Sequence, residues 1–144
     1  MKKAYATLDV VVVGVEYGHG KRRDVLSDYT FSIRDEENAN RLLTVGKAYS
    51  GLTDVEIARL TEHFLASTLE VRGRYRTVVP DTILEIAFDL IQPSARHQSG
   101  YALRFPRIAR IRTDKTLGDI DTLETCRRLA SARFADAATP KGAA

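Results

Sequence analysis

The alternation of apolar and polar residues predicts a chain built mainly from β-strands. Valines dominate Thr7 to Tyr17, which predicts a strand buried on much of both faces. Val25 to Ile33 alternates with period two and predicts a second strand. The glycines of Gly18-His-Gly20 interrupt the pattern between them, so we expect a hairpin. An acidic turn at Asp35 to Asn38 is then expected to lead into a third strand over Arg41 to Tyr49.

The period changes to that of a helix after Ser50-Gly51. Apolar residues recur at helical spacing over Thr53 to Leu69, and Thr53 with Glu56 forms a capping-box sequence at its start. A last helix is predicted over Asp121 to Phe134, with acidic residues at its first turn. The residues of that helix expected to face inward are Leu123, Cys126 and Leu129.

Two further strands are predicted between these helices. Thr82 to Gln92 returns to period two, and Pro93 ends the pattern. A basic strand is predicted from Tyr101 to Arg112. One face of that strand should carry Leu103, Phe105, Ala109 and Ile111, with Arg107 as the exception. The other face should carry Arg104, Pro106, Ile108, Arg110, Arg112 and Asp114.

The order of elements favours a mainly β domain folded as a Greek-key barrel. Three strands, a helix, two or three strands and a closing helix fit a barrel with a helix inserted after the third strand. An open sandwich is the alternative, but it leaves the helix in mid-chain without an obvious role. We predict one domain over residues 1–134 and a flexible tail over residues 135–144.

The charge distribution points to a polyanionic partner. The 144 residues carry a net charge of only +3, but the basic residues gather in three short segments. Guanidinium groups match phosphate oxygens two at a time, which suits a polyphosphate or a nucleic-acid backbone. A solvated basic edge strand is the alternative interpretation. The segments are Lys21 to Arg23, Arg72 to Arg76 and Arg104 to Lys115.

Composition excludes several other classes of protein. The single cysteine, Cys126, cannot form an internal disulfide and lies on an apolar helix face, so we expect a core thiol in a reducing compartment. The apolar run Val10 to Val13 is too short to span a bilayer, and we expect a cytoplasmic protein without membrane contact. The histidines lack the spacing of metal ligands, and no metal site is predicted.

Three stretches resemble the C-terminal oligonucleotide-binding-fold (OB-fold) domain of ATP-dependent DNA ligases. They are LDVVVVGVEYGHGKR from Leu8, VGKAYSGLTDVEI from Val45, and the long segment from Ile83 that ends in RFPRIARIRTDK at Lys115. The similarity covers about residues 2–130, and its last stretch resembles the final nucleotidyltransferase motif. Lys2-Lys3 resembles the end of the penultimate motif of that family.

The resemblance implies a role in the transfer of AMP from ATP to an enzyme lysine. A separate nucleotidyltransferase domain would hold most of the ATP and Mg²⁺, while the barrel contacts the β and γ phosphates. Mapped by motif, Arg112, Asp114 and Lys115 would be catalytic, and Lys2 and Lys3 would also contact ATP. The barrel would then close around nicked double-stranded DNA. The residues expected to bind the DNA backbone are Lys21, Arg22, Arg23, Arg72, Arg74, Arg76, Arg104, Arg107 and Arg110.

One departure from the family limits what this chain can do alone. The nucleophilic lysine of such ligases begins a Lys-x-Asp-Gly motif, and no lysine of this sequence does. We therefore expect no activity from the chain by itself, and a nucleotidyltransferase domain that works with it in cis or in trans. The family association implies a monomer that acts in DNA replication, repair or recombination, associated with the nucleoid in a prokaryote.

Three other functions remain open from the sequence. A free-standing module for single-stranded nucleic acid would bind through its aromatic residues more than through Arg112 or Lys115. The barrel of an mRNA-capping guanylyltransferase shares the same nucleotidyltransferase logic, although the RFPR sequence resembles the ligase motif. A protein-interaction domain would dock through its valine-rich first strand.

Overall fold

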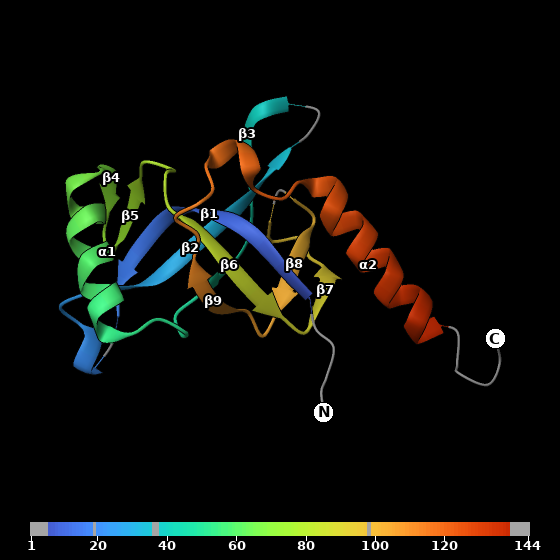
Figure 1. The fold of residues 1–144 in the computed structure, drawn as a ribbon, viewed down its shortest axis with the longest axis horizontal. Helices are drawn as coiled ribbons and strands as arrows, with labels where there is room; N and C mark the ends of the chain where they lie inside the picture. The colour runs from blue at the N-terminus through green and yellow to red at the C-terminus, as the bar shows by residue number, and fades with distance from the viewer. Residues whose placement is uncertain (1–5, 19, 36–37, 98, 139–144) are drawn as a thin grey trace.

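A long central strand organises the computed structural model of this protein. Strand β1 (Ala6–Tyr17) pairs antiparallel with β2 (Leu26–Asp35) along one edge. Its other edge pairs with β6 (Ile83–Phe88) over its first half and with β5 (Tyr75–Val78) near its end. Strand β1 can pair with three other strands because it is 12 residues long, and the sheet curves around it (Figure 1). The structure describes residues 6–18, 20–35, 38–97 and 99–138.

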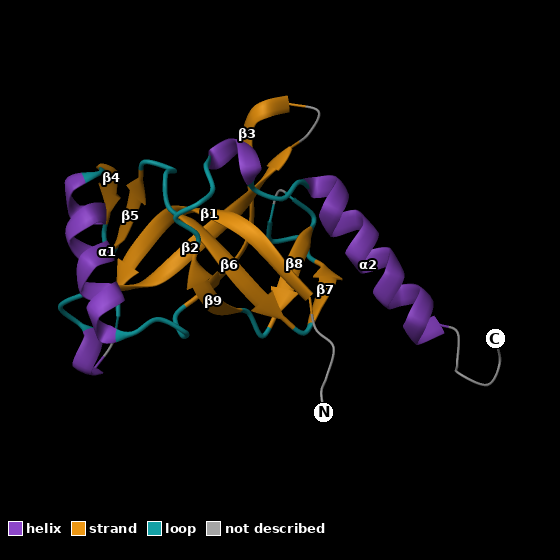
Figure 2. Ribbon diagram, in the orientation of Figure 1, coloured by secondary structure: helices purple, strands orange, loops and turns teal. Residues whose placement is uncertain are grey.

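The remaining strands extend this sheet and add a small ribbon (Figure 2). Further antiparallel pairs join β3 (Asn38–Ala48) to β2, β4 (Thr68–Arg72) to β5, and β9 (Arg107–Ile111) to β6. The separate ribbon consists of β7 (Leu90–Pro93) and β8 (Tyr101–Arg104). Two short 3₁₀ turns, η1 (Gly20–Arg22) and η2 (Leu117–Asp119), lie in the connections.

Both helices form where the sequence predicts them. In α1 (Asp54–Ala66) the Glu56 N–H donates to Thr53 Oγ1 at 3.2 Å, and the Thr53 N–H donates to Glu56 Oε1 at 2.9 Å, which confirms the capping box. The helix ends before the predicted Leu69 because the chain turns there into β4. The helix α2 (Leu123–Ala138) continues past Phe134 into the predicted tail. Residues 139–144 lie outside the described residues.

The core lies between the concave side of the sheet and the two helices. The Leu8, Val10 and Val12 side chains of β1 contribute to it, and the Cys126 side chain of α2 is fully buried there as predicted. On the other face of β1, Val11 packs with Ile83 and Ile120 in a second, smaller cluster. Strand β1 is therefore buried on both faces over its middle, which confirms the prediction made from its valine-rich sequence. No helix in the described part of the chain is long and apolar enough to cross a membrane.

The barrel closes where the chain after β3 meets β9. The Ile108 N–H donates to the Ser50 carbonyl at 2.9 Å. Gly51 has φ of +115°, and a Cβ there would lie 2.0 Å from the Ile108 carbonyl oxygen. This close approach therefore requires glycine. With α1 inserted after the third strand and α2 at its end, the domain has the predicted Greek-key barrel of the OB-fold.

Strands β4 and β5 were not predicted, and neither were the interruptions of two predicted strands. The basic segment Arg72 to Arg76 spans the end of β4, the two-residue turn at Gly73 and Arg74, and the start of β5. The strand predicted over Thr82 to Gln92 breaks at Asp89, and the chain then enters the β7–β8 ribbon. The Asp89 N–H donates to the Arg104 carbonyl at 3.0 Å, which ties the break to the basic segment.

Candidate functional site

The basic segment is two strands rather than the single strand that alternation predicts. Phe105 is the one described residue other than glycine with positive φ, at +57°, and Pro106 follows it. This pair separates β8 from β9, since such a backbone angle does not fit a strand. Phe105 is 61% exposed whereas Leu103 is buried, so the prediction that both lie on one face of a single strand is wrong.

A β-bulge in β9 corrects the predicted faces further. Arg110 pairs with Glu85 and Ile108 pairs with Ile86, which leaves Ala109 as the extra residue. The bulge turns Ile108 into the core, where it is 3% exposed, although alternation placed it among the arginines. Ala109 is exposed for the same reason. Bulges often re-aim side chains beside functional sites, and this one points Arg110 toward the outer face of β6.

The three residues predicted to be catalytic converge just beyond the end of β9. The Arg112 guanidinium donates to Asp114 through two parallel bonds, Nε to Oδ1 at 3.1 Å and Nη2 to Oδ2 at 3.0 Å. Asp9 of β1 accepts from both cations, with Arg112 Nη1 at 3.3 Å and Lys115 Nζ at 2.6 Å. We call Arg112, Asp114 and Lys115, with the side chains that contact them, the cationic cluster.

Glu85 of β6 extends the cationic cluster to Arg110. Its Oε1 lies 2.7 Å from Arg110 Nε and 3.5 Å from Arg112 Nη1. Arg110, predicted as a DNA contact, thus lies beside the predicted catalytic residues. Neither Asp9 nor Glu85 is among the site residues predicted from the sequence. Their polarity could have indicated them. Asp9 interrupts an apolar strand, and Glu85 lies on the face of β6 opposite the buried Leu84 and Ile86.

Opposite charges favour the ionised forms of Arg112, Asp114 and Lys115. The hydrogen bonds from Arg112 lower the pKa of Asp114 to about 2. The hydrogen bond to Asp9 raises the pKa of Lys115, and the bond to Asp114 raises that of Arg112. The Arg112 side chain is 15% exposed, whereas that of Asp114 is 67% exposed. The cluster therefore holds its cations in fixed positions at the edge of solvent.

A second group of basic residues gathers at the opposite end of the sheet from α2 (Figure 1). Arg74, in the β4–β5 turn, donates to the carbonyls of Tyr17 and Gly18 at 3.3 Å each. This contact places the turn against the β1–β2 loop, where Lys21 and Arg23 are exposed. The backbone of Arg22 lies in η1, and Lys2 and Lys3 lie outside the described residues.

The β4–β5 hairpin separates two arginines of its basic segment. Arg72 pairs with Tyr75 across the strands, and Arg76 pairs with Val71, so the two arginines lie on opposite faces. Arg72 forms an ion pair with Glu70 at 3.4 Å, and the guanidinium of Arg76 lies over the Tyr17 ring at 5.8 Å. A single continuous strand would have placed Arg72 and Arg76 on the same face.

Arg104 and Arg107 flank the exposed Phe105 away from the cationic cluster. The guanidinium of Arg104 lies 5.0 Å from the centre of the Phe105 ring and donates to Gln92 at 3.1 Å. Arg107 pairs with Asp89 at 3.1 Å. The RFPR sequence thus forms a protruding corner with cationic and aromatic surface.

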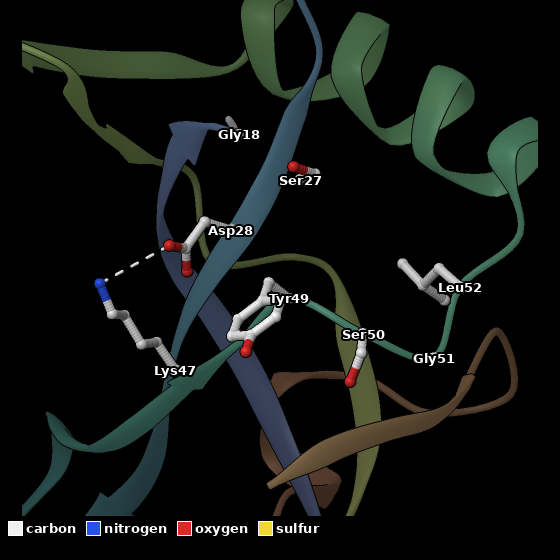
Figure 3. A pocket seen from close by; sticks show the side chains of 8 residues that line it. All are labelled: Gly18, Ser27, Asp28, Lys47, Tyr49, Ser50, Gly51 and Leu52. Atoms are coloured by element: carbon white, nitrogen blue, oxygen red, sulfur yellow. Dashed lines mark ion pairs between the residues drawn. The ribbon is translucent and has the colours of Figure 1, made fainter. Parts of the chain in front are cut away.

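A pocket of about 620 Å³ lies between β2 and the chain that follows β3 (Figure 3). Its charged lining groups are Asp28 and Lys47, which form an ion pair at 3.6 Å. The pair balances the charge of the pocket, so nothing there favours an anion. Among the described residues no group of histidine, cysteine or acidic side chains could hold a metal ion.

A family model matches the chain across this site. The model describes the C-terminal region of ATP-dependent DNA ligases and matches residues 22–115, from the β1–β2 loop to the last cation of the cationic cluster. The match includes β9, its bulge and the RFPR corner.

Curated relatives and solved structures agree with the family model. A probable DNA ligase of Opitutus terrae is 83% identical over 132 residues, which are 92% of this chain and 13% of the relative. A probable DNA ligase of Koribacter versatilis is 53% identical over 134 residues, 93% of this chain and 23% of the relative. The ligase domain of M. tuberculosis LigD matches with a TM-score of 0.65 at 19% identity, over 81% of this chain and 38% of that one, which shows the shared fold. The chain therefore belongs to the family of C-terminal domains of ATP-dependent DNA ligases.

Proposed function

We propose that this domain assists lysine adenylylation by contacting the β and γ phosphates of ATP held in a nucleotidyltransferase domain. The observation that carries the proposal is the cationic cluster, in which Arg112 and Lys115 converge beside β9 in a domain of the ligase family. The chain spans only 13% and 23% of the length of the two relatives described above, so each relative is long enough to contain a second domain.

Lysine adenylylation is favoured by cations placed where negative charge develops on the leaving pyrophosphate. When the α-phosphate is attacked by a lysine, the bond to the bridging oxygen breaks and the β-phosphate gains negative charge. Arg112 and Lys115 would stabilise that charge, because fixed cations in a site that excludes water need no reorganisation. The carboxylates of Asp9, Glu85 and Asp114 are paired with cations, so we assign Mg²⁺ and most of the ATP to the other domain.

The adenylylation role can be tested by transplanting the domain. We expect the isolated chain to take up no labelled AMP, because it has no Lys-x-Asp-Gly motif. Replacing the matching segment of the Opitutus terrae relative with this chain gives a full-length chimera, which should form the lysine–AMP adduct and seal nicked DNA. The native relative serves as the positive control. Adduct formation on the isolated chain, or an inactive chimera that folds, would contradict the proposal.

We further propose that the domain binds nicked double-stranded DNA through its basic segments. Lys21 and Arg23 are exposed, and Arg74 holds the neighbouring turn against their loop. We expect weak duplex binding whose affinity falls steeply with salt, since each neutralised phosphate releases counterions. If Lys21 and Arg23 each contact a phosphate, replacing both with glutamine should reduce the slope of log affinity against log salt by roughly two.

Titration of nicked duplex beside single strand separates this proposal from the alternative. Arg127→Gln is the matched control, because Arg127 lies on α2 at the other end of the molecule (Figure 1). It should leave the salt slope unchanged. A module for single strands is favoured by the exposed rings of Tyr49 and Phe105, 73% and 61% exposed. Tighter binding to the single strand, lost on removal of these rings, would support that module instead.

A further inference from the structure

We propose that Asp9 is a positioning residue that fixes Arg112 and Lys115 in the orientation needed for phosphate contact. The inference rests on the proposed function and names the group that prepares its site. Among the described residues, Asp9 is the one acid in contact with both cations, through Oδ1 to Arg112 and Oδ2 to Lys115. Its side chain is 13% exposed, so water competes little for these contacts.

The backbone of Asp9 is held more firmly than that of an ordinary strand residue. Its neighbours Leu8 and Val10 are buried in the core. The Asp9 N–H donates to Asp121 Oδ2 at 2.7 Å, and the Asp121 N–H donates back to the Asp9 carbonyl at 2.9 Å. The segment before α2 thus clamps β1 at this residue. Because the backbone of Asp9 is fixed, its carboxylate can orient Arg112 and Lys115.

The arrangement of acids around Arg112 supports the same role. Asp9 and Glu85 lie directly opposite each other on β1 and β6. Like charges in that position repel each other and destabilise a sheet. The guanidinium of Arg112 resolves the repulsion by contacting both, at 3.3 Å and 3.5 Å. Asp9 and Glu85 together therefore form a binding site for the Arg112 guanidinium. This accounts for two neighbouring carboxylates on a mostly apolar sheet.

Asp9 has two opposite effects on a bound triphosphate. It orients the two cations, which favours the transition state. It also places a negative charge beside the phosphates, which opposes binding in the ground state. Removing the charge of Asp9 while keeping its shape should therefore slow the chemical step without weakening the binding of ATP. A residue that served only to stabilise the fold would not separate these two quantities.

The test is Asp9→Asn in the full-length chimera, measured by single-turnover adenylylation with labelled ATP. Asparagine keeps the size of the side chain and one accepting oxygen. We expect the rate at saturating ATP to fall at least tenfold, with an apparent Kd for ATP that is unchanged or lower. A rate within twofold of the unmodified chimera would overturn the proposal. A higher Kd at an unchanged rate would overturn it as well.

Asp28→Asn is the matched control. Asp28 is an acid of similar exposure on the neighbouring strand β2, and it pairs with Lys47 away from the cationic cluster. Its replacement should leave both quantities unchanged. The failure of this inference differs from the failure of the proposed function. If Asp9 has no such role, Asp9→Asn is normal while Arg112→Ala is still slow, whereas normal rates in both variants contradict the proposed function.

A measurement on the unmodified chain tests the inference even if Asp9→Asn does not fold. The contact with Asp9 predicts an ordered Lys115 side chain whose ammonium has a pKa above the ordinary lysine value. Nuclear magnetic resonance of the lysine side chains, titrated with pH, reports both properties. A mobile Lys115 side chain whose pKa is not raised would overturn the inference.

Discussion

Arg112→Ala in the chimera is expected to slow lysine adenylylation by about 100- to 1000-fold, the usual effect of removing one donor that stabilises a developing negative charge. Arg112 is the most connected cation of the cationic cluster, with contacts to Asp9, Glu85 and Asp114. Its guanidinium is preorganised, so alanine removes both the charge and its fixed direction. Single-turnover formation of the lysine–AMP adduct measures the effect.

Two further variants show whether charge or geometry matters. Arg112→Lys keeps the charge but cannot form the paired bonds with Asp114, so we expect a rate between those of the native residue and alanine. Arg59→Ala removes an exposed arginine of α1 outside the cationic cluster and should leave the rate unchanged. Equal rates for Arg112→Ala and Arg59→Ala would exclude Arg112 from catalysis.

The elements that local sequence determines were predicted correctly. The capping box of Thr53 and Glu56 marks the start of α1 because both partners lie in one turn of the chain. The valines of β1 mark a strand covered on both faces, which the clusters around Val10 and Val11 confirm. These signals depend on near neighbours alone. The family motif likewise placed Arg112, Asp114 and Lys115 within one short segment, where the structure also finds them together.

The features that depend on strand register could not be predicted. A bulge at Ala109 leaves the composition of the strand unchanged, yet it reverses which side chains reach the core. The contact of Asp9 with Lys115 joins residues that lie 106 positions apart in the sequence, and only the pairing of β1 with β6 and of β6 with β9 brings them together. Alternation within one strand carries no information about such partners.

The same dependence on distant partners makes Gly51 a sensitive position for stability. Gly51→Ala is expected to lower the free energy of unfolding by about 2–5 kcal/mol, the combined scale of backbone strain and of overpacking. Its φ of +115° is unfavourable for alanine, and the added Cβ would lie 2.0 Å from the Ile108 carbonyl oxygen. Relief would have to move β9 and break the hydrogen bond from Ile108 to Ser50.

Gly73→Ala separates the two causes in a urea denaturation experiment. Gly73 also has positive φ, at +60°, but a Cβ there would meet nothing within 4 Å. That variant should lose only the cost of a left-handed alanine, about 1–2 kcal/mol. The additional loss in Gly51→Ala then measures the contact that closes the barrel together with the larger backbone strain at φ of +115°. Equal losses in the two variants would mean that β3 and β9 can separate without cost. The position of the cationic cluster at the end of β9 would then not depend on barrel closure.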